Sequence, residues 1–166
     1  MKTLYLVRHA KSSWDFPELT DFERPLNKRG KRDAPFMGKL LNDKNVKPEL
    51  IIASPALRAY NTARIIAGRL DYPLENIETS EVIYDASVRD LTDLIQNFDN
   101  KFNSVMLFGH NPGLTSLSNL LTDKHVGNIP TCAVVGIEFD IQSWKEVKPD
   151  TGKFLFIDKP KDHFKK

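Results

Sequence analysis

The chain has 166 residues, of which 40% are hydrophobic and 28% are charged, as in an ordinary globular domain. Its net charge of +2 is spread along the chain, which excludes a strongly basic protein that binds nucleic acid or a membrane surface. A single cysteine excludes an intrachain disulfide, and no apolar run reaches the roughly 20 residues of a membrane span. We therefore expect a monomeric, cytoplasmic protein with a single domain over residues 1–166.

Short apolar runs alternate with helical patterns through the first half of the chain. We predict a strand over 4–7, a helix over 27–43 and a strand over 50–53. Pro35 lies inside the first helix and predicts either a kink or a helix that starts near Asp33. Ser54-Pro55 is typical of an N-cap followed by proline at the first helical position, so the next helix is predicted over 54–70.

The second half begins with the same alternation and then changes. We predict a short strand over 77–78, a helix over 87–98, a strand over 104–108 and a helix over 112–121. Three predicted strands then follow without intervening helices, over 134–139, 144–147 and 154–157. This pattern predicts a three-layer α/β/α sandwich, with a mostly parallel central sheet and antiparallel C-terminal strands. The basic tail over 159–166 is expected to be flexible.

Three of the predicted strands run directly into His9, Ser54 and His110. Because ligands bind at the carboxyl ends of parallel strands, we expect these side chains to share one edge of the sheet. A neutral imidazole is a good nucleophile near pH 7, and positive charge stabilises the oxygens of a phosphoryl group under attack. Arg8 adjoins His9, and Arg58 lies about one helical turn after Ser54, with a side chain that leans back toward the strand edge. The sequence thus predicts a phosphate pocket.

Further donors to a phosphate are expected around this edge, and they are Lys11, Ser12, Ser13, Arg24 and Asn111. Arg24 has an alternative role in an ion pair with Asp21, which is the plainer interpretation. Trp14 either borders the pocket or fills space beneath its loop. Cys132 lies among apolar residues, so we interpret it as an inert core thiol.

These motifs resemble those of the histidine phosphatase, or phosphoglycerate mutase-like, superfamily. The resemblance rests on Arg8-His9-Ala10, on Ser54-Pro55-Ala56-Leu57-Arg58 and on Gly109-His110-Asn111-Pro112-Gly113. Within the superfamily the chain is most similar to the SixA-like phosphohistidine phosphatases, through segments 11–14, 21–26 and 82–86. The resemblance implies a phosphoglycerate mutase-like fold and a phosphorylated His9 in a pocket formed with Arg8, Arg58 and His110. It implies no metal ion and no other cofactor.

A general acid is the remaining part of such a site. Many members of the superfamily use a carboxylate in the region after the third strand, where this chain offers Asp85 and Glu81. We favour Asp85, because it immediately precedes the helix predicted to begin near Ser87. Asp85 has an equally good alternative role as a cap of that helix.

Chain length bears on the substrate. The interval from Thr79 to Asn103 is too short for the lid that larger relatives insert there, so we expect a minimal lid and an open pocket. A phosphohistidine carries its own ring proton and leaves as neutral imidazole, so it depends little on an enzymatic acid. We therefore predict a phosphatase that acts on phosphohistidine in a protein, such as a histidine-containing phosphotransfer domain or a carrier protein. The alternatives are a broad-specificity phosphomonoesterase and a non-catalytic phosphate-binding module.

Overall fold

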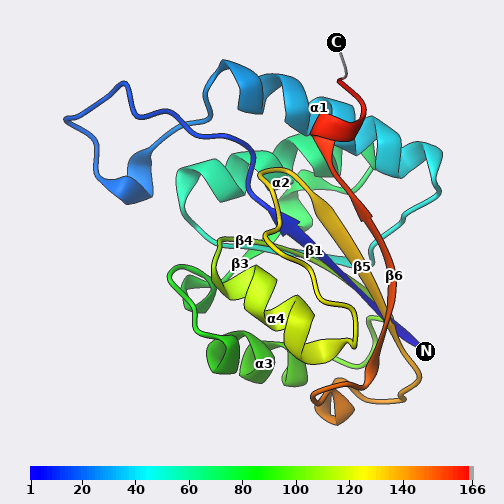
Figure 1. The fold of residues 1–166 in the computed structure, drawn as a ribbon. Coiled ribbons are helices and arrows are strands. Elements are labelled where there is room, and N and C mark those ends of the chain that lie inside the picture. The colour runs from blue at the N-terminus through cyan, green and yellow to red at the C-terminus, as the bar shows by residue number, and fades with distance from the viewer. Residues whose placement is uncertain (165–166) are drawn as a thin grey trace.

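The computed structural model describes residues 1–164 and contains a six-stranded sheet between two layers of helices (Figure 1). The strands are β1 (Lys2–Arg8), β2 (Leu50–Ala53), β3 (Glu78–Thr79), β4 (Ser104–Gly109), β5 (Val134–Phe139) and β6 (Gly152–Asp158). The α-helices are α1 (Lys28–Asp43), α2 (Leu57–Arg69), α3 (Val88–Gln96) and α4 (Gly113–Leu121). The segment between β1 and α1 extends away from the sheet at the left of Figure 1.

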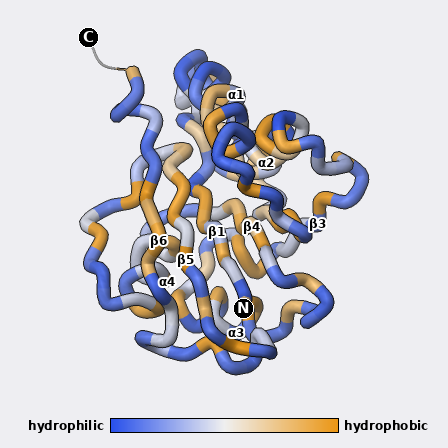
Figure 2. The backbone as a smooth tube through the Cα atoms, turned by 90° about the vertical axis from the view of Figure 1, so that its right-hand side faces the viewer, coloured by the Kyte–Doolittle hydropathy of each residue, from blue (hydrophilic) through white to orange (hydrophobic). Residues whose placement is uncertain are grey.

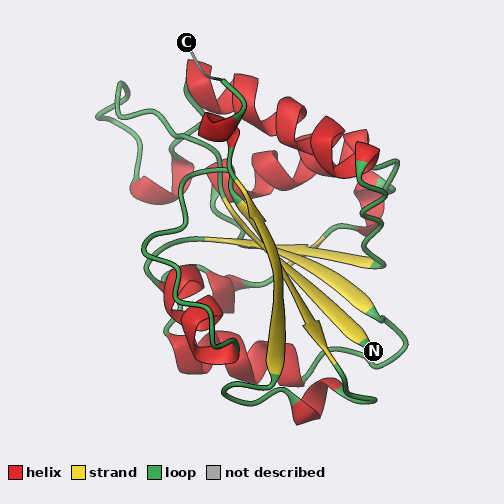
Figure 3. Cartoon of the chain, turned by 45° about the vertical axis from the view of Figure 1, so that its right-hand side comes forward, coloured by secondary structure: helices red, strands yellow, loops and turns green. Residues whose placement is uncertain are grey.

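The strands lie in the order β3-β2-β4-β1-β5-β6. The first four are parallel, while β5 pairs antiparallel with β1 and β6 pairs antiparallel with β5. Helices α1 and α2 cover one face of the sheet, and α3 and α4 cover the other (Figures 1 and 3). The predicted α/β/α sandwich with antiparallel C-terminal strands is therefore confirmed.

The central strands are apolar along their whole length because helices bury both of their faces. In β4, Val105 and Leu107 pack toward α3 and α4, whereas Met106 and Phe108 pack toward α1 and α2. Figure 2 shows the resulting apolar strands in the middle of the molecule, between helices with hydrophilic outer faces. The two cores on either side of the sheet hold the strand ends in fixed positions.

Three parallel strands end level with one another at one edge of the sheet. Arg8 of β1 pairs with Gly109 of β4, and Ala53 of β2 pairs with Phe108 of β4. The next residues continue this register, since the His9 amide donates to the Gly109 carbonyl (3.1 Å) and the Ser54 amide to the Phe108 carbonyl (3.0 Å). The loops that follow β1, β2 and β4 therefore begin side by side, as the strand alternation predicted.

The predicted strand over 144–147 is wrong, because Trp144–Glu146 form a 3₁₀ turn. The Ser143 hydroxyl accepts from the Lys145 amide, and the Glu146 carboxylate accepts from the Ser143 amide, which closes a capping box. The Trp144 ring is fully buried and its Nε1–H donates to the Phe102 carbonyl. The apolar residues at this position therefore anchor a turn beneath the sheet.

Of the two helices on the first face, α1 begins where the sequence predicted and α2 begins later than predicted. Helix α1 starts at Lys28, capped by the Asn27 side chain, and continues through Pro35, so a start near Asp33 is wrong. Helix α2 starts at Leu57, because the Ser54 hydroxyl accepts from the Ala56 amide in a tight turn that precedes the first helical residue. Ser54 is consequently free of the capping role that its sequence position suggests.

The described part of the C-terminal tail lies against α1, and the flexibility expected over 159–166 stays a prediction. Pro160 is buried at the start of a short 3₁₀ turn. The Phe164 ring lies 4.6 Å from the ring of Phe36 and 4.0 Å from the guanidinium of Arg32. Residues 165–166 lie outside the described residues. Within residues 1–164, no helix combines the length and apolarity required to span a membrane.

Candidate active site

His9 follows β1 directly and is almost completely buried. Its ring Nδ1 lies 2.8 Å from the carbonyl oxygen of Ala10. Because a carbonyl oxygen accepts but never donates, Nδ1 carries the proton and Nε2 keeps its lone pair. The main chain thus holds His9 in the tautomer that a phosphorus-attacking nucleophile requires.

His110 follows β4, and its ring centre lies 5.2 Å from that of His9. Its Nε2 lies 2.8 Å from the Ser54 hydroxyl, which follows β2. Its Nδ1 is buried and has no hydrogen-bond partner among residues 1–164. The structure therefore brings together the three polar residues that the strand pattern placed at one edge.

Arg8 and Arg58 complete the cluster. The Arg58 side chain is buried at the first turn of α2, and the Nη1 of Arg8 donates to the Ile129 carbonyl at 2.9 Å. The Nε groups of both arginines are buried and, within the described chain, have no acceptor. Thr62 ties α2 to the loop after β1, because its hydroxyl accepts from the Ala10 amide and donates to the Arg58 carbonyl. Together with His110 Nδ1, these Nε groups form a set of buried nitrogens suited to an anion.

Asp21 is a member of the site that the sequence analysis connected only with Arg24. Its carbonyl and carboxylate oxygens accept from the two Nη groups of Arg58, at 2.6 and 3.0 Å. The same carboxylate accepts from the Tyr84 hydroxyl and from Arg24 Nε. The Tyr84 hydrogen bond, followed by those of the arginines, lowers the pKa of Asp21 to about 2. Asp21 is therefore a permanent anion that orients Arg58 and is a poor candidate for a general acid.

Both pocket histidines are neutral at physiological pH. Burial lowers the pKa of His9 to about 3, and the nearby positive charges of Arg58 and Arg8 act in the same direction. Burial, followed by the charge of Arg58, lowers the pKa of His110 to about 4. A buried neutral imidazole beside two guanidiniums is available for attack without prior loss of a proton.

We expect these neutral histidines to make the fold sensitive to acid. In the unfolded chain each imidazole binds a proton near pH 6.5, whereas in the folded chain it stays neutral to about pH 4 or below. The unfolded state therefore binds more protons in this window, so the free energy of unfolding decreases as the pH falls from about 6.5 toward 4. Urea unfolding of wild type and His110→Asn at pH 7 and pH 5 measures this loss.

The variant is expected to lose less stability than wild type between the two pH values. His125→Asn is the matched control, because it removes an exposed imidazole outside the pocket. Equal pH dependence in wild type and His110→Asn would contradict a neutral, buried His110.

The predicted additional phosphate donors in the loop after β1 also take part in hydrogen bonds within the protein. The Ser12 hydroxyl accepts from Arg24 Nη1, and the Ser13 hydroxyl accepts from the Asp15 amide. Arg24 also forms the expected ion pair with Asp21 at 3.1 Å. The Trp14 ring covers the Arg24 guanidinium at 3.5 Å yet is 74% exposed, so it does not fill space beneath the loop. Arg24 therefore organises the loop around the pocket.

Lys11 and Asn111 have different surroundings. The Lys11 side chain is exposed, and its carbonyl is so close to Gly30 that a Cβ at position 30 would collide with it. The Asn111 amide donates to Ile129 and accepts from Thr115, which ties the start of α4 to the neighbouring loop. Asn111 thus has a structural role in this arrangement. Cys132 is fully buried, as predicted for a core thiol.

The two acid candidates stand apart from this network. Asp85 and Glu81 are exposed, and no hydrogen bond or ion pair within residues 1–164 links either carboxylate to the four pocket residues. The prediction that Asp85 caps a helix is wrong, because Ser87 caps α3 in a box with Asp90. Asp85 instead has a left-handed backbone, with φ of 56°.

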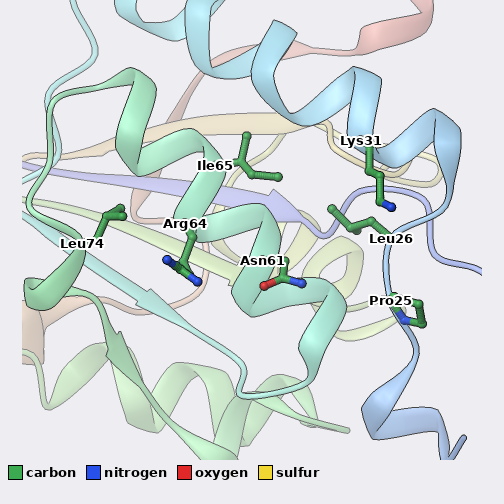
Figure 4. A pocket seen from close by; sticks show the side chains of 7 residues that line it. All are labelled: Pro25, Leu26, Lys31, Asn61, Arg64, Ile65 and Leu74. Atoms are coloured by element: carbon green, nitrogen blue, oxygen red, sulfur yellow. The ribbon is translucent and has the colours of Figure 1, made fainter.

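A separate hollow of about 480 Å³ lies on the outer side of α2 (Figure 4). Asn61, Arg64 and Ile65 of α2 face Lys31 of α1 and Leu26 across it. None of the four pocket residues lines this hollow, so it is distinct from the phosphate pocket. The described residues also contain no group of three or more histidine, cysteine or carboxylate side chains that would hold a metal ion.

Part of the chain matches a known protein family, and two similar proteins share stretches of its sequence. Residues 4–81 match the model of the histidine phosphatase superfamily, branch 1. The chain is 29% identical over 153 residues to an uncharacterised chloroplast protein of Arabidopsis thaliana, which covers 87% of this chain and 70% of that protein. It is 38% identical over 79 residues to a 2,3-bisphosphoglycerate-dependent phosphoglycerate mutase of Bifidobacterium longum, across 43% of this chain and 31% of the mutase.

Solved structures share the fold over nearly the whole chain. The protein histidine phosphatase SixA, in complex with tungstate, matches with a TM-score of 0.84 at 22% identity, covering 97% of this chain and 99% of that one. A mycobacterial glucosyl-3-phosphoglycerate phosphatase matches with a TM-score of 0.69 at 13% identity, covering 93% and 97%. Two histidines and two arginines thus gather where β1, β2 and β4 end, in a chain that has the fold of SixA and that matches the histidine phosphatase superfamily model over residues 4–81.

Proposed function

We propose that this protein is a phosphatase that removes the phosphoryl group from a phosphohistidine residue of another protein. One observation carries the proposal: His9 is held as a neutral nucleophile beside three buried nitrogens that lack acceptors within residues 1–164. Those nitrogens belong to Arg8 at the end of β1, to Arg58 in the first turn of α2 and to His110 after β4, and all three side chains are close enough to His9 to affect its pKa. A phosphoryl group has the charge and the number of oxygen acceptors that match them.

In the first step, the Nε2 lone pair of His9 forms a bond to phosphorus as the bond to the leaving group breaks. His9 keeps its Nδ1 proton on the Ala10 carbonyl, so the phosphorylated ring is cationic. The two arginines and His110 donate to the phosphoryl oxygens, on which negative charge is spread in the transition state. A substrate phosphohistidine leaves as neutral imidazole, because its second ring nitrogen already carries a proton.

In the second step, water attacks phosphorus and the bond to Nε2 breaks. The electron pair returns to Nε2, and His9 is restored as neutral imidazole with its proton still on Nδ1. The proton lost by the attacking water remains with the departing inorganic phosphate. Neither step demands proton donation from a protein carboxylate, which fits a pocket whose Arg58 is hydrogen-bonded to Asp21, a carboxylate with a pKa of about 2.

The surroundings of the pocket favour a substrate carried by a protein. Between β3 and β4 the chain forms a 3₁₀ turn at Glu81–Ile83 and α3, with no inserted lid domain. Large apolar side chains are exposed on the two segments next to the pocket, at Trp14, Phe16, Phe22 and Val82. Exposed apolar side chains grouped at an active site are typical of a protein-binding surface.

A substrate panel tests the proposal. The probes are a phosphotransfer domain phosphorylated on histidine, free phosphohistidine, para-nitrophenyl phosphate and glycerol phosphate, with phosphate release as the readout. We expect kcat/KM to be highest for the phosphorylated domain and lowest for glycerol phosphate, whose alkoxide is a poor leaving group without an acid. Equal rates on glycerol phosphate would favour a broad-specificity phosphomonoesterase. Binding of phosphate without turnover of any probe would favour a non-catalytic binding module.

Removal of the two exposed carboxylates is expected to have little effect on phosphohistidine hydrolysis. Because the leaving imidazole needs no external proton, Asp85→Asn and Glu81→Gln should each retain kcat/KM within about threefold of wild type. Loss of a true general acid usually costs between about 10²- and 10⁴-fold. A loss of that size in steady-state hydrolysis by either variant would identify that residue as the acid and contradict this mechanism.

A further inference from the structure

Ser54 occupies an unusual position between two parts of the site. It is fully buried after β2, and its hydroxyl oxygen lies 3.2 Å from the Ala56 amide nitrogen and 2.8 Å from His110 Nε2. The sequence motif suggests an N-cap, yet helix α2 begins only at Leu57. The side chain therefore has a partner that its local sequence does not explain.

The proton of this hydroxyl can be placed by counting donors and acceptors. The Ala56 amide always donates, so the oxygen accepts one hydrogen bond there. If His110 also donated through Nε2, the hydroxyl proton of Ser54 would be buried with no acceptor among residues 1–164. If Ser54 instead donates to Nε2, both of its hydrogen-bonding functions are satisfied, as buried polar groups usually are.

We propose that Ser54 is a positioning residue that holds the proton of neutral His110 on Nδ1, so that this nitrogen donates to the phosphoryl group. The inference rests on the proposed function for the identity of the anion, but the proton placement stands on the contacts alone. Nδ1 is buried and has no partner in the described part of the chain, so a donor there is free to bind a phosphoryl oxygen. Burial also lowers the pKa of His110, so the ring has one proton to place.

Both histidines carry their proton on Nδ1 in this arrangement, yet His9 acts as the nucleophile and His110 as a hydrogen-bond donor. The Ala10 carbonyl keeps the proton of His9 on Nδ1 so that Nε2 attacks. The Ser54 hydroxyl keeps the proton of His110 on Nδ1 so that Nδ1 donates. The two roles differ because the Ala10 carbonyl accepts from the His9 ring, whereas the Ser54 hydroxyl donates to the His110 ring. A hydrogen bond to one ring nitrogen decides whether the other carries the proton.

Nitrogen-15 NMR of the ring nitrogens at pH 7 tests the proton placement directly. In wild type we expect His110 to be protonated on Nδ1, with Nε2 accepting, and addition of inorganic phosphate to shift the Nδ1–H resonance. In Ser54→Ala we expect a substantial population with the proton on Nε2. In Ser54→Thr, which retains a hydroxyl, the wild-type tautomer should return. Protonation of Nε2 in wild type, or no response to phosphate, overturns the proposal without any variant.

Kinetics provide the second readout. Ser54→Ala is expected to lose between about tenfold and a hundredfold in kcat on the phosphorylated domain, as for other residues that orient a functional histidine. Ser118→Ala is the matched control, because it removes another fully buried hydroxyl, on α4, that has no partner within residues 1–164. An unchanged tautomer in Ser54→Ala, or equal losses in both variants, overturns the proposal. If wild type has the expected tautomer but turns over no probe, the proposed function fails and the proton placement stands.

Discussion

Replacement of His9 by alanine is expected to abolish both turnover and phosphate transfer to the protein. Nε2 of His9 is the proposed attacking atom, and its lone pair is available because Nδ1 is hydrogen-bonded to Ala10. Without the nucleophile, kcat should fall by a factor on the order of 10⁴ or more. Wild type incubated with a labelled phosphohistidine protein should acquire label that is lost in acid and retained in base. His9→Ala should acquire none.

The second pocket histidine is the internal control for this experiment. His110→Ala keeps the nucleophile but removes one donor, so it should still acquire label, at a rate reduced by about 10²- to 10³-fold. Label on His9→Ala at the wild-type level would place the nucleophile elsewhere. Absence of label and of phosphate release in wild type would contradict the enzymatic proposal as a whole.

Replacement of Arg58 by alanine is expected to slow the chemical step strongly. Its guanidinium is buried at the start of α2 and has an Nε with no acceptor within the described chain. Loss of one charge-stabilising donor typically lowers kcat by about 10²- to 10³-fold, which corresponds to roughly 3–4 kcal/mol of transition-state stabilisation. Single-turnover kinetics of phosphorylation would measure this loss at the chemical step.

Two comparison variants separate charge from geometry at this position. Arg58→Lys keeps a positive charge but loses the fork that contacts both the carbonyl and the carboxylate of Asp21, so it should recover little activity. Arg64→Ala, an exposed arginine on the same helix, is the matched control and should retain wild-type rates in the single-turnover assay. Full activity in Arg58→Ala would move the phosphate site away from α2.

Local pattern was sufficient to predict most of the elements, and it failed where side chains far apart in the chain decided the outcome. The central strands were predictable because helices bury both of their faces, which requires continuous apolar runs. The segment at Trp144 has two charged residues between its apolar ones and forms a turn, in which the Trp144 ring donates to the Phe102 carbonyl. Described residues of the C-terminal tail pack on α1 through Phe36 and Phe164, a contact that no local pattern reveals.

The candidate site likewise has features that the sequence predicts and features that it does not. Its four central residues could be located from the sequence. Arg8, His9 and His110 lie at strand ends, which meet at the carboxyl edge of the sheet. Arg58 lies in the first turn of the helix after β2, with a side chain that leans back toward that edge. The sequence therefore determined which side chains meet: Arg8, His9, Arg58 and His110. Their positions also depend on strand order and register, which the alternation of strands and helices does not specify.

Tertiary structure alone decided how those side chains are oriented and where their protons lie. The carboxylate that orients Arg58 comes from Asp21, 37 residues earlier, and the hydroxyl that contacts His110 comes from Ser54, 56 residues earlier. Neither partner follows from local pattern, since each contact depends on rotamers set by packing between separate segments. The sequence by itself determined which residues form the phosphate pocket. Packing determined that His9 keeps a lone pair on Nε2 and that the Nδ1 of His110 is buried without a partner in the described chain. The physical reason is that a hydrogen bond to one ring nitrogen decides the protonation of the other.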